Sequence, residues 1–135
     1  SNRAALATLV RRASAITTAE VATAATYDSR DDAVAARDTA AGALDRVRID
    51  DGATGDVFAT LTDLRAATVK AVGEQAGTLA SVRQIETAES MSATQLAYRE
   101  LGDAGRAGEV VARNRSVVWN PLFVPAGTTI EVLSD

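Results

Sequence analysis

The chain of 135 residues contains no cysteine and no histidine. Disulfide bonds, thiolate nucleophiles, imidazole catalysis and zinc sites built from cysteine or histidine are therefore excluded. Aromatic residues make up only 4% of the chain, so large side chains for a core or a binding surface are scarce. No apolar run approaches the roughly 20 residues that a membrane-spanning helix needs. No signal peptide is evident either.

What the chain has in abundance is alanine, the commonest contributor to its hydrophobic fraction of 47%. Alanine buries little area per residue, so we expect a thin core that relies on a partner chain, and hence a homo-oligomer. The net charge of −4 argues against a large surface for DNA or for an anionic membrane. Ser1 and Asn2 are typical of a tag-cleavage remnant, so we interpret the chain as a fragment of a longer protein.

Residues 1–79 have the apolar periodicity of three alanine-rich helices, at 3–26, from the Asp28/Ser29 cap to about 47, and at 56–75. Short connections favour an antiparallel helical bundle. The residues expected to face inward are Leu6, Leu9, Val10, Ala13 and Ile16, then Val34, Ala41, Leu44 and Val47, then Val57, Leu61, Leu64, Ala71 and Val72. Gly42 is either a weak point of the second helix or a place where a neighbouring helix approaches closely.

The acidic segment 50–55 between the second and third helices reads Asp-Asp-Gly-Ala-Thr-Gly. It lacks the ligand spacing of an EF-hand and the glutamate that closes one. We therefore interpret it as an exposed turn with a helix cap, and we expect no metal site and no cofactor.

In residues 80–135 the spacing of the apolar residues differs from that of the first 79 residues. It predicts the order strand, helix, helix, strand. The first strand covers 81–87, and a helix capped by Ser90 or Ser92 runs to Leu101 with Met91, Leu96, Ala97 and Leu101 inward. Gly102 suits a left-handed helix end and Asp103 the cap of a second helix over 104–113, while Asn114 suits another left-handed end. A loop with both prolines leads to a final strand over 129–133. The predicted class is α+β, mostly helical.

This order resembles the LysM module, a small two-stranded antiparallel sheet with two helices on one face. The segments that carry the resemblance are 96–103 (Leu-Ala-Tyr-Arg-Glu-Leu-Gly-Asp), 109–114 (Glu-Val-Val-Ala-Arg-Asn), and 124–127 (Val-Pro-Ala-Gly) leading into 130–133 (Ile-Glu-Val-Leu). The turn at 87–92 departs from the Gly-Asp-Thr or Gly-Asp-Ser turn usual in that family, where it forms one wall of the glycan groove.

A closer resemblance covers residues 96–133, above all 112–115 (Ala-Arg-Asn-Arg) and the run from Pro121 to Leu133. This stretch looks like the C-terminal end of the Mu-like phage tail proteins known as DNA circularisation proteins. The resemblance implies a virion protein of a contractile tail, at or near the baseplate, made in the bacterial host cytoplasm and preceded by a domain that this chain lacks. The family name implies DNA contact, but the acidic composition and dispersed arginines argue against it.

Several side chains of this module are candidates for binding. Tyr98 is expected to be half-buried with its hydroxyl at the edge, and Trp119 is the best anchor, either covering the core or docking a partner. Phe123 is expected to fill the core. The candidate binding residues are Tyr98, Asn114, Trp119, Asn120, Pro121, Phe123 and Pro125.

Catalytic and DNA-reading interpretations have little support. Glu86 and Glu89 could form a glycosidase pair, but nothing indicates that either carboxyl group is desolvated. A helix-turn-helix would present Arg106, Glu109 and Arg113, a poor set for bases and phosphates.

We therefore expect a non-enzymatic structural protein whose LysM-like module docks other tail subunits. The alternative is a module that binds peptidoglycan, a polymer containing N-acetylglucosamine.

Overall fold

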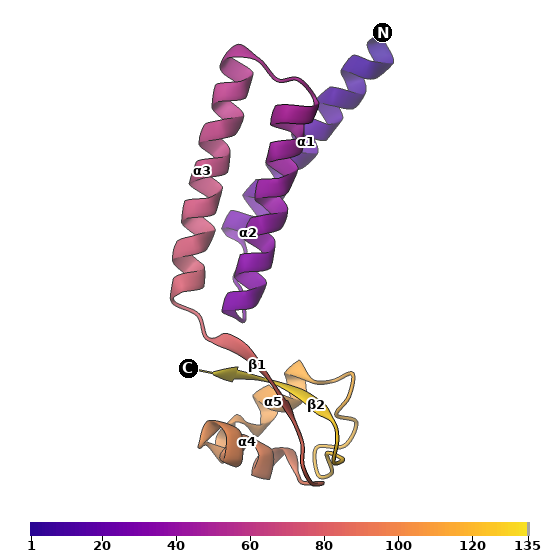
Figure 1. Ribbon diagram of the computed structural model, residues 1–135, viewed down its shortest axis with the longest axis vertical. Coiled ribbons are helices and arrows are strands. Elements are labelled where there is room, and N and C mark those ends of the chain that lie inside the picture. Colours follow the sequence, from indigo (N-terminus) through magenta and orange to yellow (C-terminus); the bar gives the residue numbers. More distant parts are fainter. Residues whose placement is uncertain (135) are drawn as a thin grey trace. The chain divides into compact units, whose positions relative to one another are not determined.

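A computed structural model describes residues 1–134 of the chain (Figure 1). The chain divides into two compact units, Ser1–Leu79 (unit 1) and Ala80–Asp135 (unit 2), although Asp135 itself lies outside the described residues. Helices account for 64% of the structure, with one two-stranded antiparallel sheet. The mostly helical α+β class expected from the sequence is therefore confirmed.

Unit 1 consists of three helices: α1 (Asn2–Ala24), α2 (Arg30–Asp45) and α3 (Gly55–Gly77). α2 continues directly into a π-helical turn, η1 (Arg46–Asp50), so this helix extends past its expected end. Figure 1 shows the three helices side by side with alternating direction, and α2 packs against both others. Ser29 caps α2 as expected, because its hydroxyl accepts a hydrogen bond from the backbone N–H of Asp32 at 3.1 Å.

Two small clusters form the core of unit 1, and alanine dominates both. Leu44 and Val72 are the largest side chains that are fully buried in them. One cluster holds Ala15, Ala19, Leu44, Val47, Ala53 and Leu61, and the other holds Ala22, Ala33, Ala40, Val72 and Ala76. The thin core inferred from the composition is present, and its helices meet through small side chains.

The prediction of which residues of α1 face inward is wrong for the first half of this helix. Leu6, Leu9, Val10 and Ala13 are exposed, whereas Ala15, Ala19 and Ala22 are buried. The helix has apolar residues on two opposite sides, and α2 and α3 cover the alanine side. Val57 at the start of α3 is also exposed, and Gly42 has open space around it rather than a close neighbour.

Unit 2 has the order β1 (Ser81–Glu86), α4 (Ala93–Leu101), η2 (Ala104–Arg106), α5 (Ala107–Arg113) and β2 (Thr129–Ser134). The strands pair antiparallel, with Ile85 opposite Ile130 and Arg83 opposite Val132. The core of the unit holds Met91, Leu96, Ala97, Val110, Val118, Val124, Ile130 and Val132. Both helices therefore contribute to the same core as the sheet.

Local sequence explains where the helices of unit 2 begin and end. Ser92 and Gln95 form a reciprocal capping box at the start of α4. Gly102 ends α4 with φ of 70°, a left-handed conformation that glycine adopts without strain. Asp103 then accepts a hydrogen bond from the N–H of Gly105 at 2.8 Å and starts the short 3₁₀ turn η2 before α5.

Three expectations for unit 2 are wrong. Asn114 is not left-handed, since its φ is −109°, and its side chain is buried. Phe123 does not fill the core and is 55% exposed, because the buried positions near it are taken by Val118 and Val124. Tyr98 is not half-buried but 68% exposed on α4.

Candidate docking surface

The loop between α5 and β2, residues 114–128, is held in place at its start by Asn114. The side-chain N–H of Asn114 donates to the carbonyl of Val110 at 2.8 Å and to that of Glu131 at 2.7 Å. Its side-chain oxygen accepts from the N–H of Glu131 at 2.8 Å. One buried side-chain amide thus joins the end of α5 to β2. The backbone carbonyl of Asn114 also accepts from the N–H groups of Val117 and Val118 at the start of the loop.

The far end of the loop is joined to the turn after β1. Met91 and Val124 exchange backbone hydrogen bonds of 3.0 and 2.7 Å. Thr87 is buried, and its hydroxyl donates to the carbonyl of Pro125 at 2.6 Å and accepts from the N–H of Thr128 at 3.0 Å. The loop is therefore fixed by hydrogen bonds to β2 and to the turn between β1 and α4.

This fixed loop turns its largest side chains outward. Trp119 is 90% exposed and Leu122 is 81% exposed, although both are apolar. Asn120 holds the bend between them, because its side-chain oxygen accepts from the N–H of Leu122 at 3.0 Å. We call Trp119, Leu122 and Phe123 the loop surface. Large apolar side chains on a rigid, exposed segment are typical of protein-binding sites.

An open pocket of about 270 Å³ adjoins the loop surface. The carbonyl of Pro121 accepts from the N–H of Ala93 at 2.8 Å, which holds the loop against the start of α4. The lining residues are Ala93, Thr94, Ala107, Gly108, Val111, Ala112, Arg115, Pro121 and Leu122. The pocket is thus formed by α4, α5 and the loop, and not by the turn after β1.

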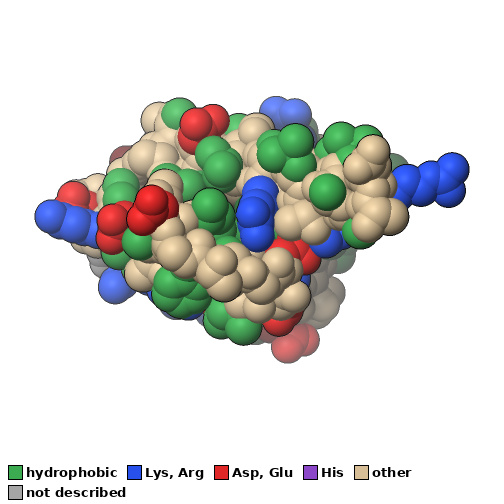
Figure 2. All heavy atoms as spheres, turned by 90° about the horizontal axis from the view of Figure 1, so that it is seen from above, with side chains coloured by type: hydrophobic (Ala, Val, Ile, Leu, Met, Phe, Trp, Pro, Cys, Tyr) green, Lys and Arg blue, Asp and Glu red, His purple; other side chains and the backbone are tan. Residues whose placement is uncertain are grey.

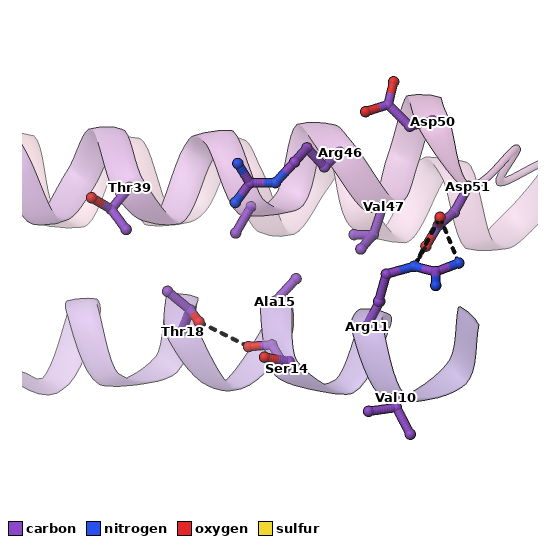
Figure 3. Close-up of a pocket in the computed structure, with 11 residues that line it drawn as sticks. Val10, Arg11, Ser14, Ala15, Thr18, Thr39, Arg46, Val47, Asp50 and Asp51 are labelled. Atoms are coloured by element: carbon purple, nitrogen blue, oxygen red, sulfur yellow. Dashed lines mark hydrogen bonds and ion pairs between the residues drawn. The ribbon is translucent and has the colours of Figure 1, made fainter. Parts of the chain in front are cut away.

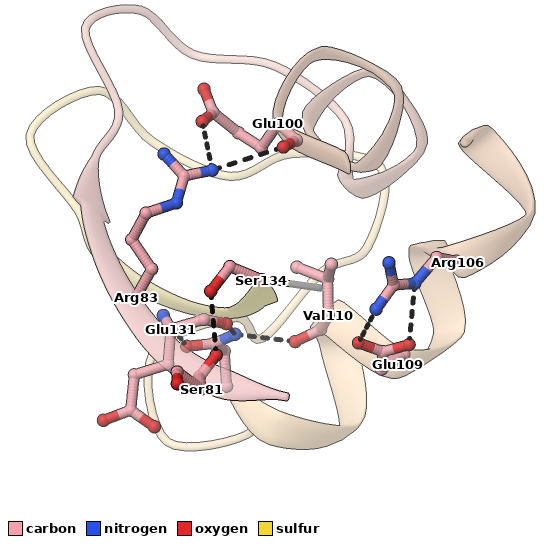
Figure 4. Close-up of polar contacts among 9 residues, drawn as sticks. Ser81, Arg83, Glu100, Arg106, Glu109, Val110, Glu131 and Ser134 are labelled. Carbon is pink, nitrogen blue, oxygen red and sulfur yellow. Dashed lines mark hydrogen bonds and ion pairs between the residues drawn. The ribbon is translucent and has the colours of Figure 1, made fainter. Parts of the chain in front are cut away.

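Most cations of unit 2 are paired with acidic side chains of the same unit. Arg83 pairs with Glu100 at 3.2 Å and Arg106 with Glu109 at 2.9 Å (Figure 4). Arg99 lies near Glu89 and Glu100, and Arg113 near Glu131. Arg115, on the pocket, has no ion pair with any described residue. Figure 2, seen from above the view of Figure 1, shows one face of the molecule on which charges of both signs are scattered, without an extended basic patch.

The structure brings some of the candidate binding residues together and separates others. Trp119, Asn120, Pro121 and Phe123 share the loop. Asn114 is buried, whereas Pro125 is exposed and its backbone carbonyl accepts from the Thr87 hydroxyl, so both help to hold the loop. Tyr98 lies on α4 five residues after Ala93, about 7.5 Å along the helix axis.

Two further residues matter here that were not among the candidates predicted from the sequence. Leu122 belongs to the loop surface, and its position between Pro121 and Phe123 in a short apolar run was the available indication. Thr87 holds the two turns together through its hydroxyl, and nothing in the local sequence marks it.

A larger pocket, of about 520 Å³, lies in unit 1 between α1 and the end of α2 (Figure 3). Two of its charged groups neutralise each other: the Arg11 Nε donates to both carboxylate oxygens of Asp51, at 3.0 and 2.9 Å, while Arg46 and Asp50 also line the pocket. This hydrogen bonding holds the pKa of Asp51 below its usual value and raises the pKa of Arg11. The Thr18 hydroxyl donates to the carbonyl of Ser14, so it is not positioned beside a general base.

Comparison with known proteins gives no assignment: no protein-family model and no curated protein matches the chain. Within residues 1–134, no helix is long and apolar enough to cross a bilayer. The same residues contain no group of three or more acidic side chains that could hold a metal ion. The features that bear on function are therefore the loop surface and the sequence resemblance of residues 96–133.

Proposed function

We propose that the chain is a structural protein of a contractile phage tail, in the baseplate region, and that unit 2 is a LysM-like module that docks a neighbouring tail subunit. The observation that carries docking is the loop surface: Trp119 and Leu122 are almost fully exposed on a loop whose backbone is fixed at both ends. The place in the virion rests on the resemblance of residues 96–133 to Mu-like tail proteins.

Rigidity is what makes the loop surface suited to docking. A flexible loop loses conformational freedom when it binds, and that loss subtracts from affinity. Here Asn114 and Thr87 already fix the loop before binding. Tryptophan is also among the residues that most often dominate interface energies. The partner we expect presents an apolar side chain to the pocket and a carboxylate to Arg115.

Direct DNA contact is not part of this proposal. Residues 80–135 hold five arginines and seven acidic residues, and Arg83 and Arg106 are engaged within the unit. Binding to phosphates requires cations that are free to replace counterions. A protein-docking role agrees better with this charge distribution.

The test is binding of the full chain to purified baseplate subunits of the same phage, with two exposed residues compared. Leu122→Asp should weaken binding at least about tenfold, because it places a charge in an apolar contact. Leu6→Asp, on unit 1, introduces the same charge at an exposed leucine and should leave binding unchanged. Failure of the wild-type chain to bind any baseplate subunit would contradict the proposal.

Peptidoglycan binding is the second candidate, favoured by the exposed indole of Trp119, which offers a flat apolar face and one hydrogen-bond donor. A pull-down on cell-wall sacculi separates the two candidates. Retention that Trp119→Ala abolishes, and that soluble N-acetylglucosamine oligomers compete away, supports glycan binding. Flow-through of the wild-type chain supports docking to protein.

A further inference from the structure

α1 carries a second apolar face that no other part of unit 1 covers. Ala15 lies in the buried face, and Leu6 comes nine residues before it, which is two and a half turns of helix. Leu6 therefore points away from α2 and α3, and it is 62% exposed. In Figure 3 the Val10 side chain points away from the α2 ribbon, although Val10 is among the residues that line the pocket, whereas Arg11 turns toward Asp51.

The spacing along this face is that of a helix-pairing seam. Leu6, Val10, Ala13 and Thr17 follow one another at intervals of four, three and four residues, which is the alternation of the two core positions of a coiled coil. Ala13 and Thr17 are small enough to let a second helix approach closely. We call this set the α1 seam.

The α1 seam has a positively charged residue at one end and a negatively charged residue at the other. The same alternation continues to Arg3 on one side and to Glu20 on the other. Both are exposed, and neither forms an ion pair with any described residue of its own chain. Arg11 and Arg12, near the middle, lie off the seam, the first paired with Asp51 and the second beside α3.

We propose that the α1 seam binds the α1 seam of a second copy of this chain, with the two helices antiparallel. With the symmetry axis between positions 11 and 12, Val10 faces Ala13 of the second copy, and Leu6 faces Thr17 of the second copy. Arg3 then lies beside Glu20 of the second copy, twice in the dimer. A parallel pair would instead place Arg3 beside Arg3 and Glu20 beside Glu20, which repel.

The contact is self-complementary, as an interface with a two-fold axis must be. It spans positions 3–20, about 26 Å of helix. This is short for a stable interface, so the dimer should dissociate on dilution. The proposal concerns unit 1 and is independent of docking through the loop surface.

The first test is the mass of the full chain in solution by light scattering, from roughly 1 to 100 μM, the range expected for a small interface. The mass should rise from 14.0 kDa toward about twice that value. Leu6→Asp should weaken dimerisation at least about tenfold, because two buried carboxylates would enter the seam. Leu122→Asp, an exposed leucine of unit 2, is the matched control and should dimerise like the wild type.

The second test exchanges the end charges. Arg3→Glu alone and Glu20→Arg alone each place like charges at both ends of the seam and should weaken dimerisation. The double variant carrying both changes restores opposite charges and should dimerise like the wild type. An equimolar mixture of the two single variants should form a heterodimer. Because Arg3 and Glu20 are exposed, none of these changes should alter the helical content measured by circular dichroism.

Orientation is tested by cross-linking, which the absence of native cysteine makes specific. A mixture of the Val10→Cys and Ala13→Cys chains should form the mixed disulfide in preference to either symmetric one. A wild-type mass that stays at 14.0 kDa throughout overturns the proposal. So does a double charge variant no better than the singles, or a predominance of the symmetric Val10→Cys disulfide.

Discussion

A single buried amide determines how the loop surface is presented. The Asn114 side chain is 4% exposed and makes three hydrogen bonds, two of them to the backbone of Glu131. Buried hydrogen-bonding groups that lose their partners are costly, because water cannot replace the lost bonds. The position of the loop therefore depends on this residue more than on any apolar contact of Trp119.

Replacing Asn114 with alanine should destabilise unit 2 by about 2 to 4 kcal/mol, because the backbone N–H and carbonyl of Glu131 would lose the side chain that they bond to. Asn120→Ala is the control in the same loop. It removes one exposed hydrogen bond, and it should cost less than about 1 kcal/mol. Hydrogen exchange of the β2 amides measures the loss of stability that each of the two variants causes. Equal effects of the two variants would contradict the role assigned to Asn114.

The Arg11–Asp51 contact gives unit 1 a pH dependence with a defined sign. The pKa of Asp51 is lowered by its hydrogen bond to Arg11, so the contact stabilises the fold above the unfolded-state pKa of about 3.9. That stabilisation is lost as the pH falls through the lower, folded-state value. Asp51→Asn should therefore be less stable than the wild type at pH 7 and equally stable near pH 2.

Urea unfolding of unit 1 at the two pH values, followed by circular dichroism, measures this difference. Asp50→Asn is the matched control. Asp50 is the exposed neighbour of Asp51 and has no ion pair with a described residue. High salt should reduce the effect of Asp51→Asn at pH 7, because the contact is accessible to counterions. A difference that persists unchanged at pH 2 would show that the charge of Asp51 is not its source.

At the scale of elements, the helices of unit 2 are short and depend on how they end. α4 has nine residues, and isolated helices of that length are marginal in water. The capping box at Ser92 and the left-handed Gly102 satisfy backbone groups that would otherwise lack partners. The α4–α5 corner, which leads into the α5 residues that line the pocket, is therefore determined by local backbone conformation.

Two glycines of this corner should respond to alanine in opposite directions. A Cβ atom would meet open space at Gly102 and at Gly108. Gly102 has φ of 70°, so Gly102→Ala should destabilise unit 2 by about 1 to 2 kcal/mol. Gly108 is helical, and Gly108→Ala should stabilise it by up to about 1 kcal/mol. Hydrogen exchange of the β1 and β2 amides measures both, and a shared sign would refute the conformational argument.

The elements that the sequence predicted best are those with local determinants. Ser29, Ser92 and Gly102 each act within one helical turn, so their roles follow from the residues beside them. The order and pairing of β1 and β2 followed from the positions of the apolar runs and the loops between them.

What the sequence could not decide depends on long-range contacts. Periodicity shows that Leu6 and Val10 share a face of α1, but not whether another helix covers that face. Likewise, Phe123 is exposed because the loop path is set by bonds between residues far apart in the chain, from Asn114 to Glu131 and from Thr87 to Thr128. The loop surface was therefore only partly predictable.

At the scale of the whole molecule, the chain has separate cores. The cluster around Ile130 contains only residues of unit 2, and the clusters around Leu44 and Val72 contain only residues of unit 1. The two units also offer different surfaces, the loop surface on one and the α1 seam on the other. Such a division suits a protein that must hold its own copies together while binding a different subunit.

Separate cores predict separate unfolding. Leu44 is fully buried in unit 1, and Leu44→Ala should destabilise that unit by about 2 to 5 kcal/mol through lost contacts and the cavity left behind. Hydrogen exchange of the full chain should then show faster exchange across α1, α2 and α3, with the β1 and β2 amides as protected as in the wild type. Ile130→Ala should give the reverse pattern. If either substitution accelerates exchange in both units equally, the units unfold as one, and a partner bound to the loop surface would also stabilise the helices that carry the α1 seam.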